Sequence, residues 1–175
     1  MIKERRNGQG AEVAGVTVEG KVAYLSLVQL QAGVTWQKSH YTRPEKWSKD
    51  SSVPAEKRIF RTPDWYGYFT ATYSPVKPLN IALSGTYTGS MIVQHMKGYI
   101  PKDMAVTTPD FFDMNLKISY DFSLYKFITL QLNAGVQNIF NAYQRDFDQG
   151  KERDSGYIYG PSMPRSYFAG AKLMF

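Results

Sequence analysis

The 175-residue sequence contains no cysteine, so it can hold neither a disulfide framework nor a thiolate site. Histidine is nearly as scarce, because His40 and His95 are the only two, too few for a histidine metal cluster. No run approaches about 18 apolar residues, which excludes a transmembrane helix. The first residues lack the regions of a signal peptide. If the protein is exported, we therefore expect a mature form or a missing N-terminus.

The charge pattern excludes further function classes. The net charge is +6, and basic residues are frequent in the stretch 41–62. Such a loop can attract anions or lipid phosphates, or it can simply be solvated. Basic residues lie between the apolar stretches and aromatic residues at their ends, which argues against a single-stranded nucleic-acid platform. No Ser-His-Asp arrangement, phosphate loop or paired-carboxylate motif is present, so we expect no enzyme and no cofactor.

Apolar and polar residues alternate along most of the chain, in which 43% of residues are hydrophobic and 15% aromatic. A period of two held over about ten residues indicates a half-buried β-strand and excludes a helix. From 28 to 36 the apolar positions are Val28, Leu30, Ala32, Val34 and Trp36. The same period recurs at 15–24, 65–73, 79–87 (expected to run on toward Val93), 112–122, 128–136 and 165–175. The sequence therefore predicts an all-β chain of about seven strands.

The connections between these strands alternate in length. Short turns are expected near 25, 75 and 124, and long loops at 41–62, 95–108 and 141–163. Soluble meanders usually have short loops at both ends, whereas outer-membrane barrels combine short periplasmic turns with long extracellular loops. Aromatic residues gather at the strand ends, where membrane-interface girdles belong: Tyr24, Trp36, Trp65, Tyr73, Tyr120 and Phe122. We predict a segment of an antiparallel, up-and-down transmembrane β-barrel.

The final stretch, 164–175, has one fully apolar face. Its alternate residues are Tyr167, Ala169, Ala171, Leu173 and Phe175. A terminal aromatic on such a strand suits the apolar outer band of a membrane barrel. Taken alone, these residues also fit the last strand of a soluble sandwich.

Four pieces of sequence together resemble the C-terminal part of TonB-dependent outer-membrane receptors. They are Arg61-Thr62-Pro63, Tyr87-Thr88-Gly89-Ser90, the stretch VQNIFNAY at 136–143, and the closing strand at 164–175. The resemblance extends from about residue 15 to residue 175. It implies a barrel of about 22 strands, of which residues 1–175 would form about the last seven, with 1–14 as a loop or strand start. The N-terminal plug and the segment that contacts TonB would lie outside this chain.

The resemblance also implies a function and a place in the cell. The expected function is TonB-dependent import of a scarce large solute, such as a ferric siderophore, haem or cobalamin, across the outer membrane of a Gram-negative cell. This chain would supply barrel wall and extracellular loops. The expected partners are outer-membrane lipid, the plug and earlier strands, the TonB complex through the missing part, and the barrel-assembly machinery through the C-terminal strand, where Tyr167 and Phe175 carry the signature. No nucleic-acid partner is expected.

Candidate binding residues come from the long loops, because aromatic and basic side chains dominate binding sites. Those predicted here are Lys46, Trp47, Arg58, Tyr99, Tyr157 and Tyr159. The alternative interpretation is that these side chains only order the loops.

The carboxylates from Asp146 to Asp154 have the alternate spacing of a calcium loop. However, Gly150 is fifth rather than sixth, and Lys151 and Arg153 interleave, so a salt-bridged surface loop is the favoured interpretation. Strand parity places both histidines on the lipid-side register or just above it, away from any metal in the lumen.

A second hypothesis is a complete small barrel of about eight strands that acts as an adhesin or membrane anchor. Such a barrel has a filled interior. The odd strand count argues against it, because single-chain bacterial barrels have even numbers of strands.

Overall fold

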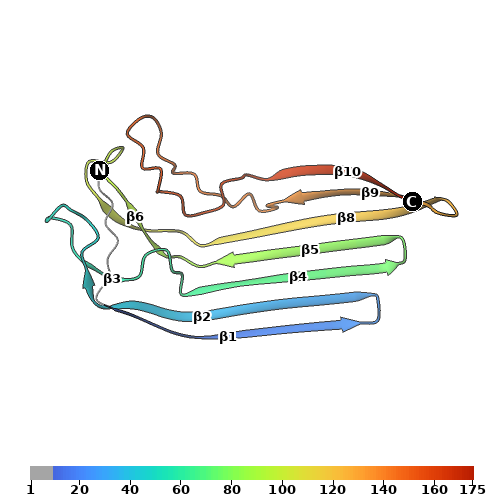
Figure 1. Ribbon diagram of the computed structural model, residues 1–175, viewed down its shortest axis with the longest axis horizontal. Coiled ribbons are helices and arrows are strands. Elements are labelled where there is room, and N and C mark those ends of the chain that lie inside the picture. The colour runs from blue at the N-terminus through green and yellow to red at the C-terminus, as the bar shows by residue number, and fades with distance from the viewer. Residues whose placement is uncertain (1–9) are drawn as a thin grey trace.

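The computed structural model describes residues 10–175, which form strands and loops (Figure 1). No helix among these residues is long and apolar enough to cross a membrane. Seven long strands lie side by side in one antiparallel sheet, in the order β1-β2-β4-β5-β8-β9-β10. Their bounds are β1 (Ala11–Tyr24), β2 (Val28–Glu45), β4 (Trp65–Val76), β5 (Leu79–Thr88), β8 (Phe111–Tyr125), β9 (Ile128–Gln137) and β10 (Ser166–Met174).

Three short strands complete the fold. β3 (Glu56–Arg58) pairs with the far end of β2, whereas β6 (Ile92–His95) and β7 (Met104–Thr107) form a separate two-stranded ribbon. Each long strand of the main sheet pairs with its neighbour along the chain, so the predicted up-and-down, all-β arrangement of seven main strands is confirmed. The predicted loop at 1–9 lies outside the described residues.

The cross-strand register joins the apolar positions of all seven main strands into one face. Leu116, for example, pairs with Leu83 on β5 and with Val136 on β9, and Val136 in turn pairs with Tyr167 on β10. Because side chains alternate between the faces of a strand, this pairing puts odd positions 79–87 and even positions 114–122 on the same face. We call it the apolar face.

The opposite face, which we call the polar face, is held together by cross-strand hydrogen bonds. The hydroxyl groups of Thr17 and Thr35 lie 2.9 Å apart. Tyr68 donates from its hydroxyl to Glu19 Oε1 at 3.2 Å. Gln131 Nε2 donates to Asp121 Oδ1 at 2.7 Å. Cross-strand pairs of this kind stabilise a sheet without an apolar core on that side.

Several strand ends differ from those expected. β1 begins at Ala11, within the stretch 1–14 predicted as a loop or strand start, and β2 runs to Glu45, beyond the predicted Trp36. The two strands stay paired as far as Ala11 opposite Tyr41. β5 ends at Thr88 and does not continue toward Val93. A Cβ at Gly89 would meet the Trp65 carbonyl oxygen, to which Gly89 N donates at 2.8 Å, and beyond it the chain leaves the sheet.

The buried apolar side chains lie at one end of the sheet, in the loops, in the ribbon and at Phe111, where β8 begins. Buried apolar residues are Val53, Met91, Ile92, Val93, Phe111 and Tyr157. On the apolar face, by contrast, Val22 is 67% exposed and Leu30 is 43% exposed. A contiguous exposed apolar surface of this kind marks a face that another apolar phase or partner covers.

Candidate functional site

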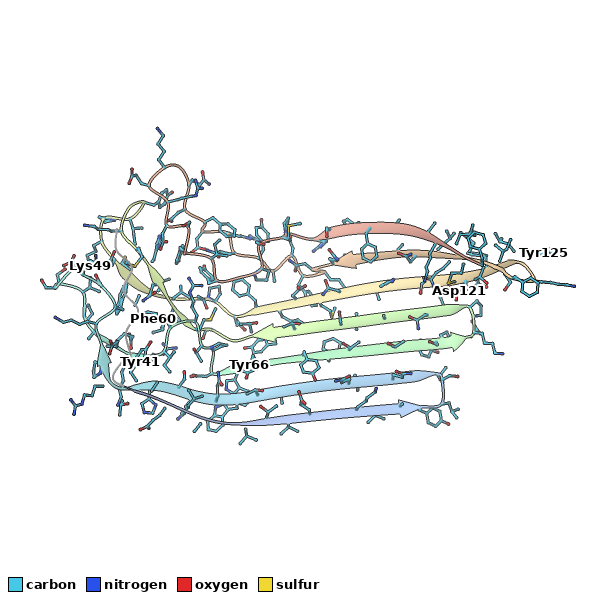
Figure 2. The ribbon with its side chains drawn as sticks, viewed as in Figure 1. Tyr41, Lys49, Phe60, Tyr66, Asp121 and Tyr125 are labelled. Carbon is cyan, nitrogen blue, oxygen red and sulfur yellow. The ribbon has the colours of Figure 1, made fainter. Side chains whose placement is uncertain are left out.

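The long connections gather at one end of the sheet and the tight turns at the other (Figure 1). The long connections span 46–64, 89–110 and 138–165, and we call this the loop end. The short turns follow Tyr24, Val76 and Tyr125, and we call this the turn end. Figure 2 shows Lys49 and Phe60 at the loop end, with Asp121 and Tyr125 at the turn end.

The three long loops pack into one body around a small apolar core. Met91, Val93 and Tyr157 form this core, and Val106 and Tyr159 pack against it. Its apolar side chains come from the ribbon region and from the last loop. Because the core spans two loops, these loops support each other rather than moving separately.

Gln144 fixes the path of the last loop from inside. Its side chain is 1% exposed, and its Nε2 donates to the Tyr157 carbonyl oxygen at 3.1 Å. Its Oε1 accepts from the Tyr159 amide at 2.9 Å, and its own amide donates to the Pro161 carbonyl oxygen at 3.0 Å. A buried amide with its groups satisfied in this way specifies one conformation for 157–161.

Asp146 joins two tyrosines across the same loop. Tyr157 donates its hydroxyl to Asp146 Oδ2 at 2.8 Å, and Tyr159 donates to Oδ1 at 2.6 Å. Burial alone would raise the pKa of Asp146, but the hydrogen bonds from Tyr159 and Tyr157 outweigh it and leave that pKa lowered. Burial, followed by the Asp146 hydrogen bond, raises the pKa of Tyr157, and the same causes raise the pKa of Tyr159 to about 12.

His95 lies inside the loop body, which corrects its predicted place on the lipid-side register. Its Nε2 lies 2.9 Å from both carboxylate oxygens of Asp148, and its ring stacks on Tyr157 at 3.7 Å. The parity argument fails because the chain leaves the main sheet before β6. His40 does remain on β2, where its Nε2 lies 3.4 Å from Glu12 Oε2.

The carboxylates Asp148 and Asp154 accept hydrogen bonds from backbone amides and so hold the loop, rather than pairing with Lys151 or Arg153. Asp148 Oδ2 also accepts from the Asp154 amide at 2.9 Å, and Asp154 accepts from the amides of Met96 and Gly156, each at 2.8 Å. Within residues 10–175, the close contacts between a basic side chain and a carboxylate both involve histidine: His40 with Glu12 and His95 with Asp148. The salt bridges expected in this surface loop are therefore not found between Lys or Arg and a carboxylate among the described residues. The described residues contain no group of three or more His, Cys, Asp or Glu that could hold a metal ion.

Arg61 links all three loops. Its backbone has φ of 60°, in the left-handed region, and its amide donates to the Ile92 carbonyl oxygen at 2.8 Å. Its Nη1 donates to the Ile158 carbonyl oxygen at 2.6 Å, and its Nη2 donates to that of Gly156. One further contact connects the first loop to the second, because Asp103 accepts from Ser48 Oγ at 2.5 Å. Within the second loop, Asp103 also accepts from the Lys97 amide at 2.7 Å.

The six predicted binding residues do not converge on one point. Tyr157 and Tyr159 meet, with ring centroids 5.3 Å apart, but Tyr157 is 3% exposed and both hydroxyls are bonded to Asp146. Trp47 lies elsewhere, beside a cavity of about 210 Å³ that Lys102 and Asp103 also line. The predicted residues outside these two groups are exposed: Lys46, Arg58 and Tyr99.

Asp113 occupies a polar groove that the sequence analysis missed. It belongs to the polar face of β8 and lines two adjoining cavities of about 260 and 390 Å³, beneath the 159–164 segment. Its Oδ1 is buried and has no hydrogen-bond partner among the described residues. Such an oxygen accepts a hydrogen bond from a donor or a cation and repels an anion. The unbroken alternation of β8 predicts that Asp113 lies on the polar face. The groove itself forms only because the distant 159–164 segment folds over that face.

The predicted interface aromatics form two groups on the apolar face. Trp36 and Trp65 pair at the loop end, with ring centroids 6.4 Å apart. Near the turn end lie Tyr24, Tyr73, Tyr120 and Phe122. The closing aromatics Tyr167 and Phe175 are 73% and 90% exposed.

Comparison of the sequence with protein-family models and with curated proteins finds no match. Among solved structures, the chain is similar to the closed form of the ferric-catecholate import receptor Fiu from E. coli, with a TM-score of 0.64 and 21% identity over 94% of this chain and 21% of that chain. It is similar to FpvAI in complex with a pyocin, with a TM-score of 0.62 and 15% identity over 94% of this chain and 19% of that one.

A third similar structure is a mutant of the ferric enterobactin receptor PfeA from Pseudomonas aeruginosa. Its TM-score is 0.54 and its identity 15%, over 93% of this chain and 22% of that chain. The chain thus spans about a fifth of the length of each of these structures. At these identities the likeness establishes the fold, and the barrel fold implied by the sequence resemblance is confirmed.

Proposed function

We propose that this chain forms about seven wall strands and three extracellular loops of a TonB-dependent outer-membrane receptor that imports a ferric siderophore. The observation that carries the proposal is the sheet with one apolar and one polar face in the fold of import receptors. An apolar face suits lipid and a polar face suits a wet or plugged lumen. Residues 1–175 would be the C-terminal part of the barrel, with plug, TonB contact and earlier strands in the rest of the polypeptide.

The loop end is proposed to face the cell exterior. Long loops lie outside in outer-membrane barrels, and charged loops do not lie in the hydrocarbon layer. The aromatics at the two ends of the apolar face then lie at the two membrane interfaces, as amphipathic rings prefer. Outer-membrane lipid would cover the apolar face, and the barrel-assembly machinery would engage the closing strand with Tyr167 and Phe175.

The loop contacts divide into two groups. Tyr157 and Tyr159 are committed to Asp146 and the loop core, so we assign them to loop order. Lys46, Trp47 and Arg58, together with the 57% exposed Tyr99, remain our candidates for solute contact. The cavity beside Trp47, at about 210 Å³, is smaller than the roughly 300–1,000 Å³ of ligand pockets, so this chain would hold only an edge of the solute.

Charge favours the outer loops over the inner groove for an anionic ferric catecholate. The unpaired Asp113 oxygen in the polar groove repels an anion. Lys46 and Arg58 are exposed on the first loop and attract it. Haem and cobalamin differ from a catecholate in charge and shape, so comparing the three solutes tests this assignment.

The small complete barrel fits the structure less well. A closed barrel requires its first and last strands to pair, yet β1 and β10 are the two edges of the sheet in the described part of the chain. An adhesin or anchor of about eight strands would need an eighth wall strand and closure between these edges.

The test is solute uptake by the protein from its complete gene, expressed in an iron-limited, receptor-deficient Gram-negative strain. We expect uptake of iron-55 as a ferric catecholate, and loss of uptake when TonB is deleted. Trp47→Ala and Lys46→Ala should weaken binding of the chelate, whereas Lys151→Ala, a matched loop lysine outside the candidate set, should not. Uptake of haem or cobalamin alone would overturn the solute class, and TonB-independent behaviour would overturn the transport proposal.

A further inference from the structure

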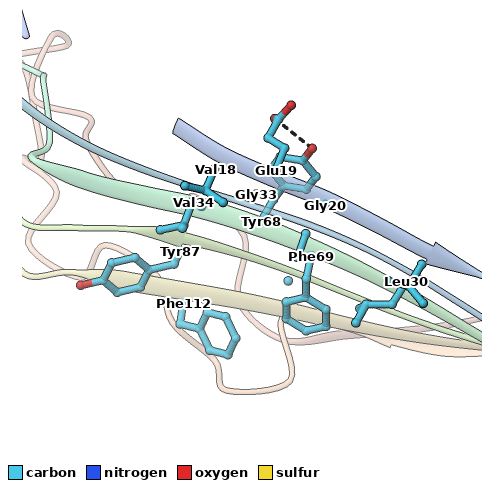
Figure 3. Close-up of a pocket in the computed structure, with 14 residues that line it drawn as sticks. Val18, Glu19, Gly20, Leu30, Gly33, Val34, Tyr68, Phe69, Tyr87 and Phe112 are labelled. Carbon is cyan, nitrogen blue, oxygen red and sulfur yellow. Dashed lines mark hydrogen bonds between the residues drawn. The ribbon is translucent and has the colours of Figure 1, made fainter. Parts of the chain in front are cut away.

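The apolar face carries a hollow of about 590 Å³ that crosses β1, β2, β4 and β5 (Figure 3). Its floor is made of small residues, among them Gly20, Ala32 and Gly67. Bulky side chains surround it: Val18, Val22, Leu30, Phe69, Tyr87 and Phe112. Figure 3 shows the Glu19–Tyr68 hydrogen bond on the other side of the sheet from Phe69 and Phe112. The hollow therefore belongs to the apolar face.

Nothing in the described part of the chain requires a glycine at position 20. It lies inside the 14-residue strand β1, whose pairing with β2 runs without a register shift. Its φ is not in the left-handed region, and a Cβ there would meet nothing within 4 Å. Glycine weakens a strand interior, and where no bulge explains it, glycine marks a place at which another group approaches closely.

Three other strand glycines lie against an aromatic ring, whereas Gly15, Gly67 and Gly170 meet backbone or non-aromatic side chains. Gly85 lies under the ring of Phe69, Gly33 under the ring of Tyr68, and Gly135 under the ring of Phe168. In each case the aromatic residue is the direct cross-strand partner of the glycine. At these three positions the sheet pairs a glycine with an aromatic ring that lies over it, which restores packing that the glycine lacks. Gly20 resembles Gly33 and Gly85 in having no backbone close to its missing side chain, unlike Gly15 and Gly67.

The corresponding ring for Gly20 cannot come from β2, where its partner is the small Ala32. The other side of Gly20 is the edge of the sheet, because β1 is the end strand in the described part of the chain. Backbone N–H and C=O groups on such an edge must be paired inside a membrane, and lipid cannot pair them. The neighbour at this edge is therefore a β-strand.

We propose that an antiparallel strand of the same polypeptide pairs with the free edge of β1 and places an aromatic ring over Gly20, on the apolar face. This inference rests on the proposed function only in taking the barrel to be completed by further strands of that polypeptide. It specifies the partner: a strand with outward apolar side chains at alternate positions and Phe, Tyr or Trp directly opposite Gly20. The ring fills the part of the hollow nearest β1.

Nuclear Overhauser contacts in the full-length receptor test this. The protein is deuterated except for glycine α-protons and aromatic rings, and is embedded in nanodiscs of deuterated lipid. Gly85, beneath Phe69, is the internal positive reference, and Gly170, whose nearest side chain is Asn133, is the negative one. We expect the Gly20 α-protons to show aromatic contacts and an upfield ring-current shift like those of Gly85.

Each other outcome overturns the proposal. Contacts with acyl-chain protons in protonated lipid, with none to aromatic protons, would show that lipid fills the hollow. Aromatic contacts seen only between differently labelled molecules would show a second copy. The readout does not involve transport, so a receptor that imports no siderophore would still give the Gly20 contact, and the two proposals fail separately.

A pair of variants gives an independent measurement. Gly20→Phe puts a second ring where the partner ring lies and should lower the temperature at which the full-length barrel loses heat modifiability. Val22→Phe, on the same strand and face at a site that already has a bulky side chain, should leave that temperature nearly unchanged. Equal temperatures for the two variants would contradict a ring over Gly20.

Discussion

The ring of His95 stacks face to face on Tyr157, with centroids 3.7 Å apart and planes inclined by 8°. The Nε2 of the same histidine lies 2.9 Å from both carboxylate oxygens of Asp148, so the end of β6 contacts the last loop at Tyr157 and at Asp148. Since Tyr157 also belongs to the loop core, this contact couples the ribbon to the 138–165 connection. The loops then open together rather than one at a time.

Replacing His95 with Ala should therefore loosen the last loop. In intact cells, trypsin should cleave the wild-type protein slowly at Lys151 or Arg153, which are exposed, and cleave the His95→Ala variant several times faster. His40→Ala, which removes a half-buried histidine on β2, is the matched control and should leave the rate unchanged. Cleavage that requires permeabilised outer membranes would overturn the proposed orientation of this loop.

The Asp146 contact should make the last loop sensitive to strong acid. Because the pKa of Asp146 is lowered in the folded protein, its stabilisation is present above the unfolded value of about 3.9 and is lost as the pH falls through the folded pKa. Hydrogen exchange in 157–159 should therefore speed up below about pH 4, before the wall strands respond. An Asp146→Asn receptor should lack this acid-dependent step.

Tyr159 should show the opposite pH dependence. Its pKa is raised to about 12, so its contribution is fully present below the unfolded value of about 10 and disappears as the pH rises through 12. Asp146→Asn should lower that pKa but leave it above 10, because burial is the larger cause. Ultraviolet titration of the tyrosinate band, with Tyr159→Phe to identify the signal, measures the shift, and an unchanged titration would contradict the Asp146 contact.

The alternation that predicted the wall strands is a local property, which is why it could be read from the sequence. The period of two over 79–87 and 112–122 makes Leu83 and Leu116 apolar positions of their own strands, and the structure pairs them. His95 was misplaced because parity has meaning only while a strand continues, and the chain leaves the sheet after Thr88. The partners of Asp146 lie 11 and 13 residues further along the same loop, and the groove at Asp113 is completed by the distant 159–164 segment. A period of two along a strand records neither arrangement.

If the apolar face meets lipid, a charged side chain placed on it should lower the free energy of unfolding. Replacing Leu116 with Arg near the membrane midplane should destabilise the barrel by about 2–4 kcal/mol, and replacing the adjacent Asn115 should cost much less. The same contrast is expected between Leu83→Arg and Ser84→Arg on β5. Urea unfolding of the full-length receptor in lipid vesicles measures these differences. Equal costs at neighbouring positions would show that the apolar face does not meet lipid.

Residues 10–175 expressed alone should not form a closed monomer. β1 and β10 are the two edges of the sheet, and their outer N–H and C=O groups have no strand partner among the described residues. A bilayer does not tolerate such edges, and in water they pair with other copies. Size-exclusion chromatography with light scattering in detergent should therefore show aggregates or edge-to-edge oligomers. A heat-modifiable, protease-resistant monomer would mean that β1 and β10 had paired, which would favour the small complete barrel.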